Sequence, residues 1–190
     1  MLELRLDLIG EEPGGLFAEI PGNLQVIATF RPGVVEGEKR LEALKRCMDL
    51  GASYVDVELE SREEILEKIR AHASQRGCRL IISYHNFDLT PPADQLKMIL
   101  EKCYSLGGDI AKIATMVHTG EEAVRLLSLY GHPGRKVVLG MGEGGRITRV
   151  AAPYLGSEFT FASVDDSGGT APGQMTVADL KHIYQLINGS

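Results

Sequence analysis

Long apolar runs and a positive net charge are both missing from this sequence of 190 residues. No stretch approaches the roughly 20 apolar residues that cross a bilayer, and Met1 is followed at once by the alternating string LELRLDL. The chain has 20 lysines and arginines against 26 acidic residues, so its net charge of -6 would repel a phosphate backbone. We therefore expect a cytoplasmic protein that binds neither a membrane nor a nucleic acid.

The sequence also has few cysteines, and they do not have the spacing of a metal centre. Cys47, Cys78 and Cys103 form no CxxC pair and have no nearby histidine at zinc spacing. We expect three buried free thiols and no metal. The hydrophobic share of 44% and the charged share of 24% are typical of a globular protein, and the length suits one domain over residues 1–190.

Short runs rich in valine, isoleucine and leucine alternate with stretches in which apolar residues recur every three or four positions. The runs predict seven strands, at 2–7, 24–30, 54–59, 79–85, 109–116, 136–142 and 159–163. The stretches predict amphipathic helices at 37–50, 61–76, 92–106, 119–130, 145–155 and 175–187. Ser61 with Glu64, and Thr119 with Glu122, have the spacing of capping boxes. Strands that alternate with helices predict a parallel sheet.

The charges within the predicted strands distinguish an open doubly wound sheet from a closed barrel. Strands covered by helices on both faces are normally apolar throughout. Here Glu3, Arg5 and Asp7 share one face of the first run, and Asp56 and Glu58 share one face of the third. Any one of these could be a surface strand with a wet face. Several helix-flanked strands with charge on one face together indicate the polar interior of a TIM-like (β/α) barrel, with its site at the carboxyl ends of the strands.

Lys112 lies in the fifth predicted strand between Ile110 and Ala114. Burial there disfavours the charged ammonium form, and positive charge on Arg5 or Arg31 would disfavour it further. A neutral amine that faces a cavity can form a Schiff base with a carbonyl substrate. The structural alternative is a lysine that reaches the strand end or pairs with a carboxylate.

His85 ends the fourth predicted strand, in the segment SYHNF. Imidazole titrates near neutral pH, which suits a general acid and base. Glu58, on the neighbouring strand, is the nearest carboxylate that could orient the ring. A lone histidine at a strand end is more often structural, but its combination with Lys112 and Glu58 favours catalysis.

Two glycine-rich segments follow the later strands. DDSGGTAPGQ at 165–174 is typical of either a substrate lid or an ordinary connection. MGEGGRITR at 141–149 lacks the GxGxxG spacing and the lysine of a P-loop, so it is a weak nucleotide motif. Arg149 in that segment could instead bind a carboxylate with two hydrogen bonds.

Taken together, these segments resemble those of the type I 3-dehydroquinate dehydratases of the shikimate pathway. The matching strings are ELRLD at 3–7, TFR at 29–31, DVEL at 56–59, SYHNF followed by TP at 83–91, DIAKIA at 109–114, MGEGGRITR at 141–149 and TAPGQ at 170–174. The resemblance implies a (β/α)8 barrel that removes water from 3-dehydroquinate through a lysine Schiff base, without a metal or cofactor. It implies that Lys112 forms the imine, that His85 is the acid and base, and that Glu58 orients His85. The substrate-binding residues that it implies are Glu3, Arg5, Arg31, Arg149, Thr170 and Gln174.

The chain departs from the family pattern in two places. Thr170 replaces the usual serine and keeps the hydroxyl. The start of the chain resembles the family's second strand, so the first βα unit of a barrel that normally has eight units in roughly 250 residues is expected to be missing. Its absence would leave strand edges unpaired, so a fragment, a trimmed protein and a strand supplied by a partner all stay open, and we expect a homodimer.

Two other functions stay open beside the dehydratase. One is a binding module of the same fold that has poor activity or depends on a partner. The other is a lysine-dependent class I aldolase.

Overall fold

The structure is a computed structural model that describes residues 1–10, 13–33, 37–164 and 169–189. The chain divides into two compact units, and each is described by itself. Unit 1 consists of Met1–Ser83 and Lys102–Ile110, and unit 2 of Tyr84–Glu101 and Ala111–Ser190. The expectation of a single domain over 1–190 stays a prediction.

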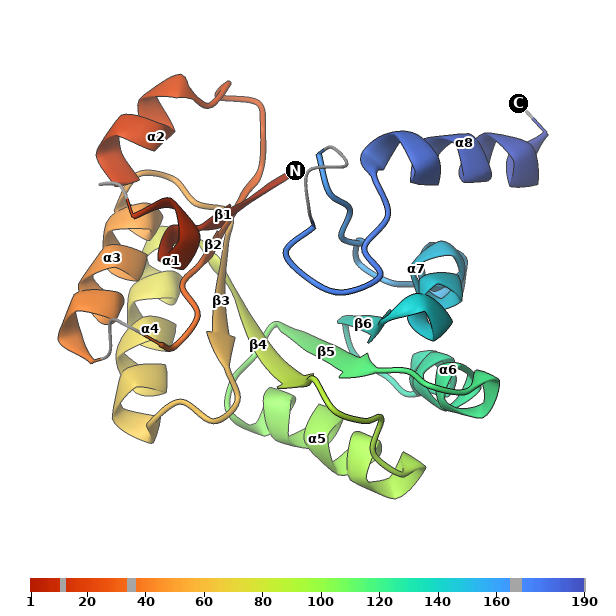
Figure 1. Ribbon diagram of the computed structural model, residues 1–190. Coiled ribbons are helices and arrows are strands. Elements are labelled where there is room, and N and C mark those ends of the chain that lie inside the picture. The colour runs from red at the N-terminus through yellow and green to blue at the C-terminus, as the bar shows by residue number, and fades with distance from the viewer. Residues whose placement is uncertain (11–12, 34–36, 165–168, 190) are drawn as a thin grey trace. The chain divides into compact units, whose positions relative to one another are not determined.

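Unit 1 contains parallel strands with helices beside them (Figure 1). The strands follow one another in space in the order β1 (Leu2–Arg5), β2 (Val26–Thr29), β3 (Tyr54–Glu58) and β4 (Arg79–Asn86). In the register, Arg5 lies beside Thr29, Thr29 beside Asp56, and Glu58 beside Ser83. The carboxyl ends of these strands therefore bring polar residues to one edge of the sheet.

The helices of unit 1 follow its strands along the chain, and some of them pack against the strands. They are α1 (Leu6–Ile9), α2 (Pro13–Glu19), α3 (Glu38–Asp49) and α4 (Glu63–Arg76). Helices α3 and α4 pack side by side (Figure 1). Helix α3 buries Leu41, Leu44 and Met48, which recur three and four residues apart on one face.

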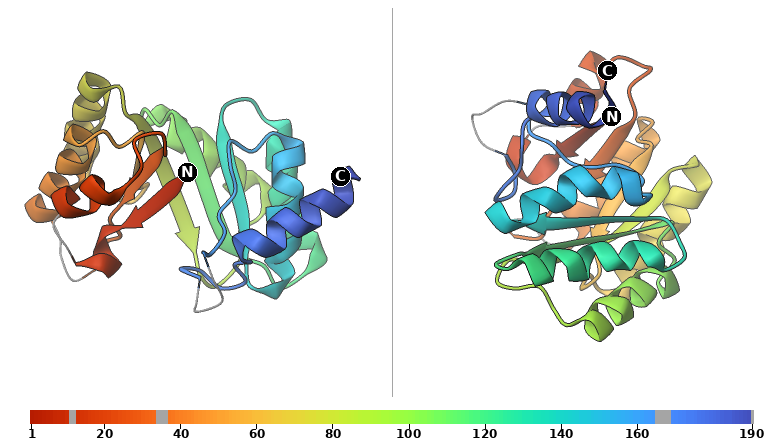
Figure 2. Two further views of the ribbon diagram at one scale, coloured as in Figure 1. Left: turned by 90° about the horizontal axis from the view of Figure 1, so that it is seen from above. Right: turned by 90° about the vertical axis from the view of Figure 1, so that its right-hand side faces the viewer.

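Unit 2 contains the parallel pair β5 (Ile110–Met116) and β6 (Lys136–Met141), in which Lys112 lies beside Val137. Its helices are α5 (Ala93–Ser105), α6 (Gly120–Ser128), α7 (Arg146–Ala151) and α8 (Val177–Asn188), with 3-10 turns at Leu129–Gly131, Glu143–Gly145 and Ala152–Leu155. Helices α6 and α7 pack against β6, and α8 packs against α7 (Figure 2). The chain passes between the two units within β4 and α5 and at the start of β5.

Six strands, and not the predicted seven, are present in the described part of the chain. The run 159–163 forms no strand, and only Ser163 makes an isolated bridge, with Thr176. Its backbone is bound by side chains instead, because Phe161 O accepts from Arg149 and Phe159 O accepts from Ser157. The expectation that a first βα unit is missing stays a prediction.

The first predicted strand is shorter than its alternating sequence. Strand β1 ends at Arg5 and helix α1 begins at Leu6, so Asp7 lies on a helix and not on the charged strand face. The alternation of apolar and charged residues cannot show where the strand ends, because Leu6 and Asp7 continue the same pattern into the helix.

Helix starts follow the predicted capping only in part. Thr119 and Glu122 form both hydrogen bonds of a capping box at α6, as predicted. The box at Ser61 and Glu64 is wrong, because α4 begins at Glu63 and its N-cap position is Arg62. The hydroxyl of Ser61 is buried and has no hydrogen-bond partner in the described part of the chain.

The three cysteines are buried free thiols, as predicted. Burial raises the pKa of Cys78 and of Cys103 to about 12, so both stay protonated and unreactive at neutral pH. Of the helices that the structure describes, none has the length and apolarity required to cross a membrane.

Candidate active site

Unit 1 gathers the charged residues at its strand ends into one hydrogen-bonded cluster. Arg31, two residues after β2, makes a two-point ion pair with Asp56, with N–O distances of 3.1 and 3.0 Å. Its Nη1 also donates to Glu58 at 2.5 Å and to Ser83 Oγ at 3.0 Å. Ser83 Oγ in turn donates to Asp56 at 2.5 Å. We call these four residues the Arg31 cluster.

Charge pairing makes the burial of the Arg31 cluster possible. Asp56 is fully buried and Glu58 is 7% exposed, and an unpaired carboxylate there would cost several kcal/mol. Burial alone would lower the pKa of Arg31, but the charges of Asp56 and Glu58 outweigh it and raise that pKa above its ordinary value. Arg31 therefore stays positively charged, with both carboxylates as counterions.

Glu58 has a second cationic partner, which comes from a helix. Arg40, on α3, donates its Nη2 to Glu58 Oε2 and its Nε to Phe30 O at 2.5 Å. Arg31 occupies the other oxygen, Glu58 Oε1, so each carboxylate oxygen of Glu58 accepts from a guanidinium. The sequence pattern does not single out Arg40, because charged residues are common on an amphipathic helix.

The predicted ligands Glu3 and Arg5 lie on β1, and both have partners within unit 1. Arg5 makes a two-point ion pair with Asp7 at 3.0 and 2.7 Å, and Thr29 Oγ1 donates to Glu3 at 2.9 Å. Burial would raise the pKa of Asp7, but hydrogen bonds from Arg5 and from the backbone N–H of Arg31 hold it below its ordinary value. Arg5, like Arg31, thus carries its own counterion and is not the uncompensated positive charge that the sequence suggests.

Unit 2 brings Lys112 and Arg149 to one residue, Phe161. The ammonium of Lys112, on β5, lies 4.1 Å from the centre of the Phe161 ring, and the lysine is 5% exposed. Arg149, on α7, donates its Nη1 to Phe161 O at 3.2 Å. Phe161 belongs to the run predicted as a strand, so its role as a shared contact was not foreseeable from that pattern.

Arg149 is a buried cation without a counterion among the described residues. It is 2% exposed, its Nε has no hydrogen-bond partner among the residues that the structure describes, and burial lowers its pKa to about 10. Buried guanidinium groups are normally paired, because the unpaired charge is costly. An unpaired N–H on a buried arginine therefore favours binding of an external anion, and a carboxylate fits its fork geometry.

The glycine-rich segment 141–149 determines where Arg149 lies. Thr148 Oγ1 accepts from Gly140 N at 2.7 Å and donates to Gly145 O at 2.6 Å, which joins the start of α7 to β6. A Cβ on Gly145 would lie 2.3 Å from the carbonyl carbon of Gly140, so only glycine permits this approach. These glycines serve close backbone packing, which explains why they lack the spacing of a nucleotide-binding loop.

His85 lies near the end of β4 and stacks on Phe87, with ring centres 6.2 Å apart. The loop after it is tightly held. Asn86 Oδ1 accepts from the backbone N–H groups of Asp88 and Leu89, and Thr90 Oγ1 donates to Met116 O at 2.6 Å. The SYHNF and TP segments therefore attach the His85 loop to the end of β5.

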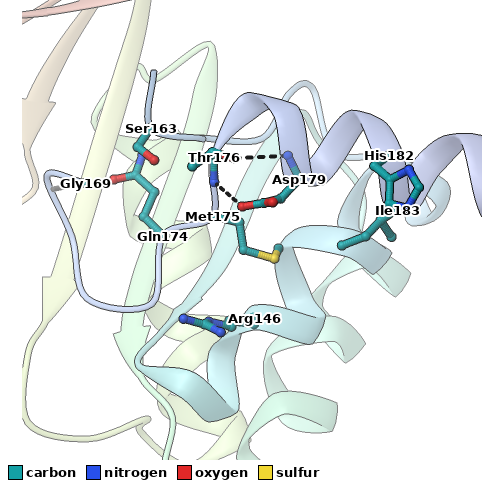
Figure 3. A pocket seen from close by; sticks show the side chains of 9 residues that line it. All are labelled: Arg146, Ser163, Gly169, Gln174, Met175, Thr176, Asp179, His182 and Ile183. Carbon is teal, nitrogen blue, oxygen red and sulfur yellow. Dashed lines mark hydrogen bonds between the residues drawn. The ribbon is translucent and has the colours of Figure 1, made fainter. Parts of the chain in front are cut away.

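The predicted ligands Thr170 and Gln174 contact each other, with Thr170 Oγ1 donating to Gln174 Oε1 at 3.4 Å. Gln174 lines a cavity of about 450 Å³ with Arg146 from α7 and His182 from α8 (Figure 3). Within the described residues of unit 2, the lining of this cavity includes neither Lys112 nor Arg149. Of the predicted lid at 165–174, residues 165–168 lie outside the described residues, and the lid stays a prediction.

Each unit thus assembles part of the predicted set. Unit 1 joins Arg31 to Glu58, and unit 2 joins Lys112 to Arg149 through Phe161. The roles predicted for these residues and for His85, Glu3, Arg5, Thr170 and Gln174 stay predictions.

Comparison with known proteins identifies the family. The family model described as type I 3-dehydroquinase matches residues 1–190. A 3-dehydroquinate dehydratase of Methanocaldococcus jannaschii is 37% identical over 195 residues, which cover 99% of this chain and 87% of the relative. This chain belongs to the type I 3-dehydroquinase family. The expected enzyme class, a type I 3-dehydroquinate dehydratase and hence a carbon–oxygen lyase, is confirmed at the level of the family.

Solved structures of type I dehydroquinases and their relatives have a similar fold. The 3-dehydroquinate dehydratase of Aquifex aeolicus is 32% identical with a TM-score of 0.79, covering 96% of this chain and 82% of that one. The type I enzyme of Clostridium difficile is 22% identical with a TM-score of 0.87, covering 98% and 81%, and it bears on the fold alone. The predicted α/β class with parallel strands of TIM-like type is confirmed in these coarse terms.

Proposed function

We propose that this chain converts 3-dehydroquinate to 3-dehydroshikimate and water through a Schiff base on Lys112, in the shikimate pathway. The observation that carries this proposal is the shared contact of Lys112 and Arg149 with Phe161. An amine that can attack a ketone and a buried guanidinium that can bind a carboxylate belong to the same unit. 3-Dehydroquinate carries both a ketone and a carboxylate, so it matches this pair of groups.

The proposed reaction uses side chains of this chain and water. The amine of Lys112 attacks the ketone and water leaves, which gives an iminium. The iminium draws electrons toward nitrogen, so His85 can remove a proton from the adjacent carbon. The imidazolium of His85 then gives that proton to the departing hydroxyl, and water hydrolyses the new imine. One water is used and two are released, so the net change is the loss of one water and the return of the free amine.

In this proposal Glu58 orients His85, and its charge is stabilised by Arg31 and Arg40. Arg149 binds the substrate carboxylate. Glu3, Arg5, Arg31, Thr170 and Gln174 are the remaining proposed substrate contacts. No metal or cofactor is assigned a role.

Replacing Arg149 by glutamine is expected to weaken substrate binding. A charged hydrogen bond contributes about 1.5–3 kcal/mol, so KM rises roughly 10- to 100-fold while kcat changes less. Steady-state kinetics measure this, with Arg149→Lys as a variant that keeps the charge but loses the two-point fork. An unchanged KM in Arg149→Gln would contradict the assignment.

The pKa of about 10 means that Arg149 is protonated below that pH and loses its proton above it. KM of the unaltered enzyme should therefore rise above pH 10.

Turnover of 3-dehydroquinate by the purified chain tests the proposed function, because the product contains a conjugated carbonyl that absorbs in the ultraviolet. Formation of 3-dehydroshikimate supports it. Substrate binding without turnover would instead favour a binding module. Cleavage of aldol substrates in place of dehydration would favour a class I aldolase.

A homodimer and a cytoplasmic location also stay predictions. If association completes the active protein, the rate per chain rises with protein concentration, and the same concentrations give dimers in sedimentation. A constant rate per chain with a monomer at every concentration would contradict the homodimer.

A further inference from the structure

Arg40 is buried at a position that helix stability does not explain. It is 7% exposed and is the third residue of α3, which begins at Glu38. A cation in the first turn of a helix is disfavoured, because the helix dipole is positive at that end. Burial of the guanidinium there therefore requires a specific partner, and the partners are Glu58 Oε2 and Phe30 O.

We infer that Arg40 is a positioning residue for the dehydration, which holds the Glu58 carboxylate in one orientation and balances its charge. This inference rests on the proposed function, in which Glu58 orients His85. Arg40 acts only through Glu58 and is not assigned a contact with substrate.

The balance of charge around Glu58 depends on Arg40. Among the described residues of unit 1, the charged groups near Glu58 are Arg31 after β2, Arg40 on α3, Asp56 on β3 and Glu60 just after β3. Burial raises the pKa of Glu60, and the nearby charge of Glu58 adds to that increase. Glu60 therefore becomes negatively charged less readily than an ordinary glutamate. Asp56 and Glu58 are then balanced by two guanidinium groups. Without Arg40, Glu58 loses the guanidinium at Oε2 and shares Arg31 with Asp56, so the negative charge of the cluster is less well compensated.

The orientation of Glu58 depends on Arg40 as well. The Nε anchor to Phe30 O fixes the guanidinium plane, and Nη2 then fixes Oε2. Arg31 cannot do this alone, because its Nη1 is shared among Asp56, Glu58 and Ser83. A lysine at position 40 would supply the charge but not the planar fork of a guanidinium, so it would hold the Glu58 carboxylate less rigidly.

Arg40→Met, Arg40→Lys and Arg46→Met test the inference by the pH dependence of kcat and kcat/KM. Arg46 is an exposed arginine on the same helix and serves as the matched control. For Arg40→Met we expect kcat to fall roughly 10- to 100-fold, as for other residues that orient a catalytic group, with little change in KM. The acid limb of its profile should move to higher pH by about one to two units.

The other variants separate charge from position. Arg40→Lys should return the acid limb to its original pH but recover kcat only in part, and Arg46→Met should behave as the unaltered enzyme. Borohydride reduction with 3-dehydroquinate should still attach ligand to Lys112 in Arg40→Met, because Arg40 has no role in imine formation.

Loss of folding stability in Arg40→Met with an unmoved acid limb and unchanged kcat would show a purely structural arginine and overturn the inference. If Arg40→Met does not fold, Arg40→Lys decides: a lowered kcat with an unmoved acid limb supports the inference, and an unchanged kcat overturns it. Absence of turnover in the unaltered chain would contradict the proposed function itself. That result differs from an active enzyme whose pH profile is unchanged in the Arg40 variants.

Discussion

Lys112→Ala is expected to lose dehydration of 3-dehydroquinate, with kcat/KM falling by roughly a thousandfold or more. Lys112 is the proposed nucleophile, and no water molecule can replace the electron-withdrawing imine that it forms. The amine lies on β5 against the Phe161 ring, where the strand fixes its position. Steady-state assays of the purified variant measure the loss.

Two variants control for charge and burial. Lys112→Arg keeps a cation against Phe161 but cannot form an imine, so it should be as inactive as Lys112→Ala. Lys136, on β6, is another buried lysine, and its ammonium donates to His132 O and Gly134 O. Lys136→Met should reduce stability while the active fraction retains its kcat. Activity of Lys112→Ala above a tenth of the original would show that Lys112 is not the nucleophile.

His85→Gln is expected to lower kcat by roughly a hundredfold to ten thousandfold, which is the usual range for a general acid and base. Glutamine keeps a polar side chain at the end of β4 but does not exchange protons at neutral pH. Imine formation on Lys112 should continue, so the variant should accumulate a covalent adduct that has not lost the substrate hydroxyl. Mass spectrometry after borohydride reduction detects this adduct.

His118 provides the matched control for His85. It belongs to the same unit, and its Nε2 contacts Asp88 O on the surface. His118→Gln should leave kcat within about threefold, as is usual for a surface change. Equal losses in the two variants, or full activity in His85→Gln, would contradict the assignment of His85.

Periodicity predicted most of the fold because each element buries one face. The alternation in 54–59 gave β3 with Asp56 and Glu58 on one side, and the three- and four-residue spacing in 37–50 gave α3. The run 159–163 has the same pattern as a strand, but two of its backbone carbonyls accept hydrogen bonds from the side chains of Arg149 and Ser157. Sequence pattern carries no information on such competition.

Residues of the site could be predicted from the sequence where a charged residue stands among apolar ones that are expected to be buried. A lysine between apolar residues, as at Lys112, is conspicuous because strand interiors are apolar. Arg40 and Phe161 are not conspicuous, since an arginine on a helix and a phenylalanine in an apolar run are ordinary. Their contacts with Glu58 and Lys112 join segments far apart in the chain, and only the folded structure relates them.

The most direct test is a single mass spectrum of the chain, reduced with borohydride in the presence of 3-dehydroquinate and digested to peptides. We predict that the ligand mass is attached to the peptide that contains Lys112, and that Lys112→Ala shows no such mass. A chain left unmodified by this treatment, or one that carries the ligand on a different lysine, would contradict a Schiff base at Lys112.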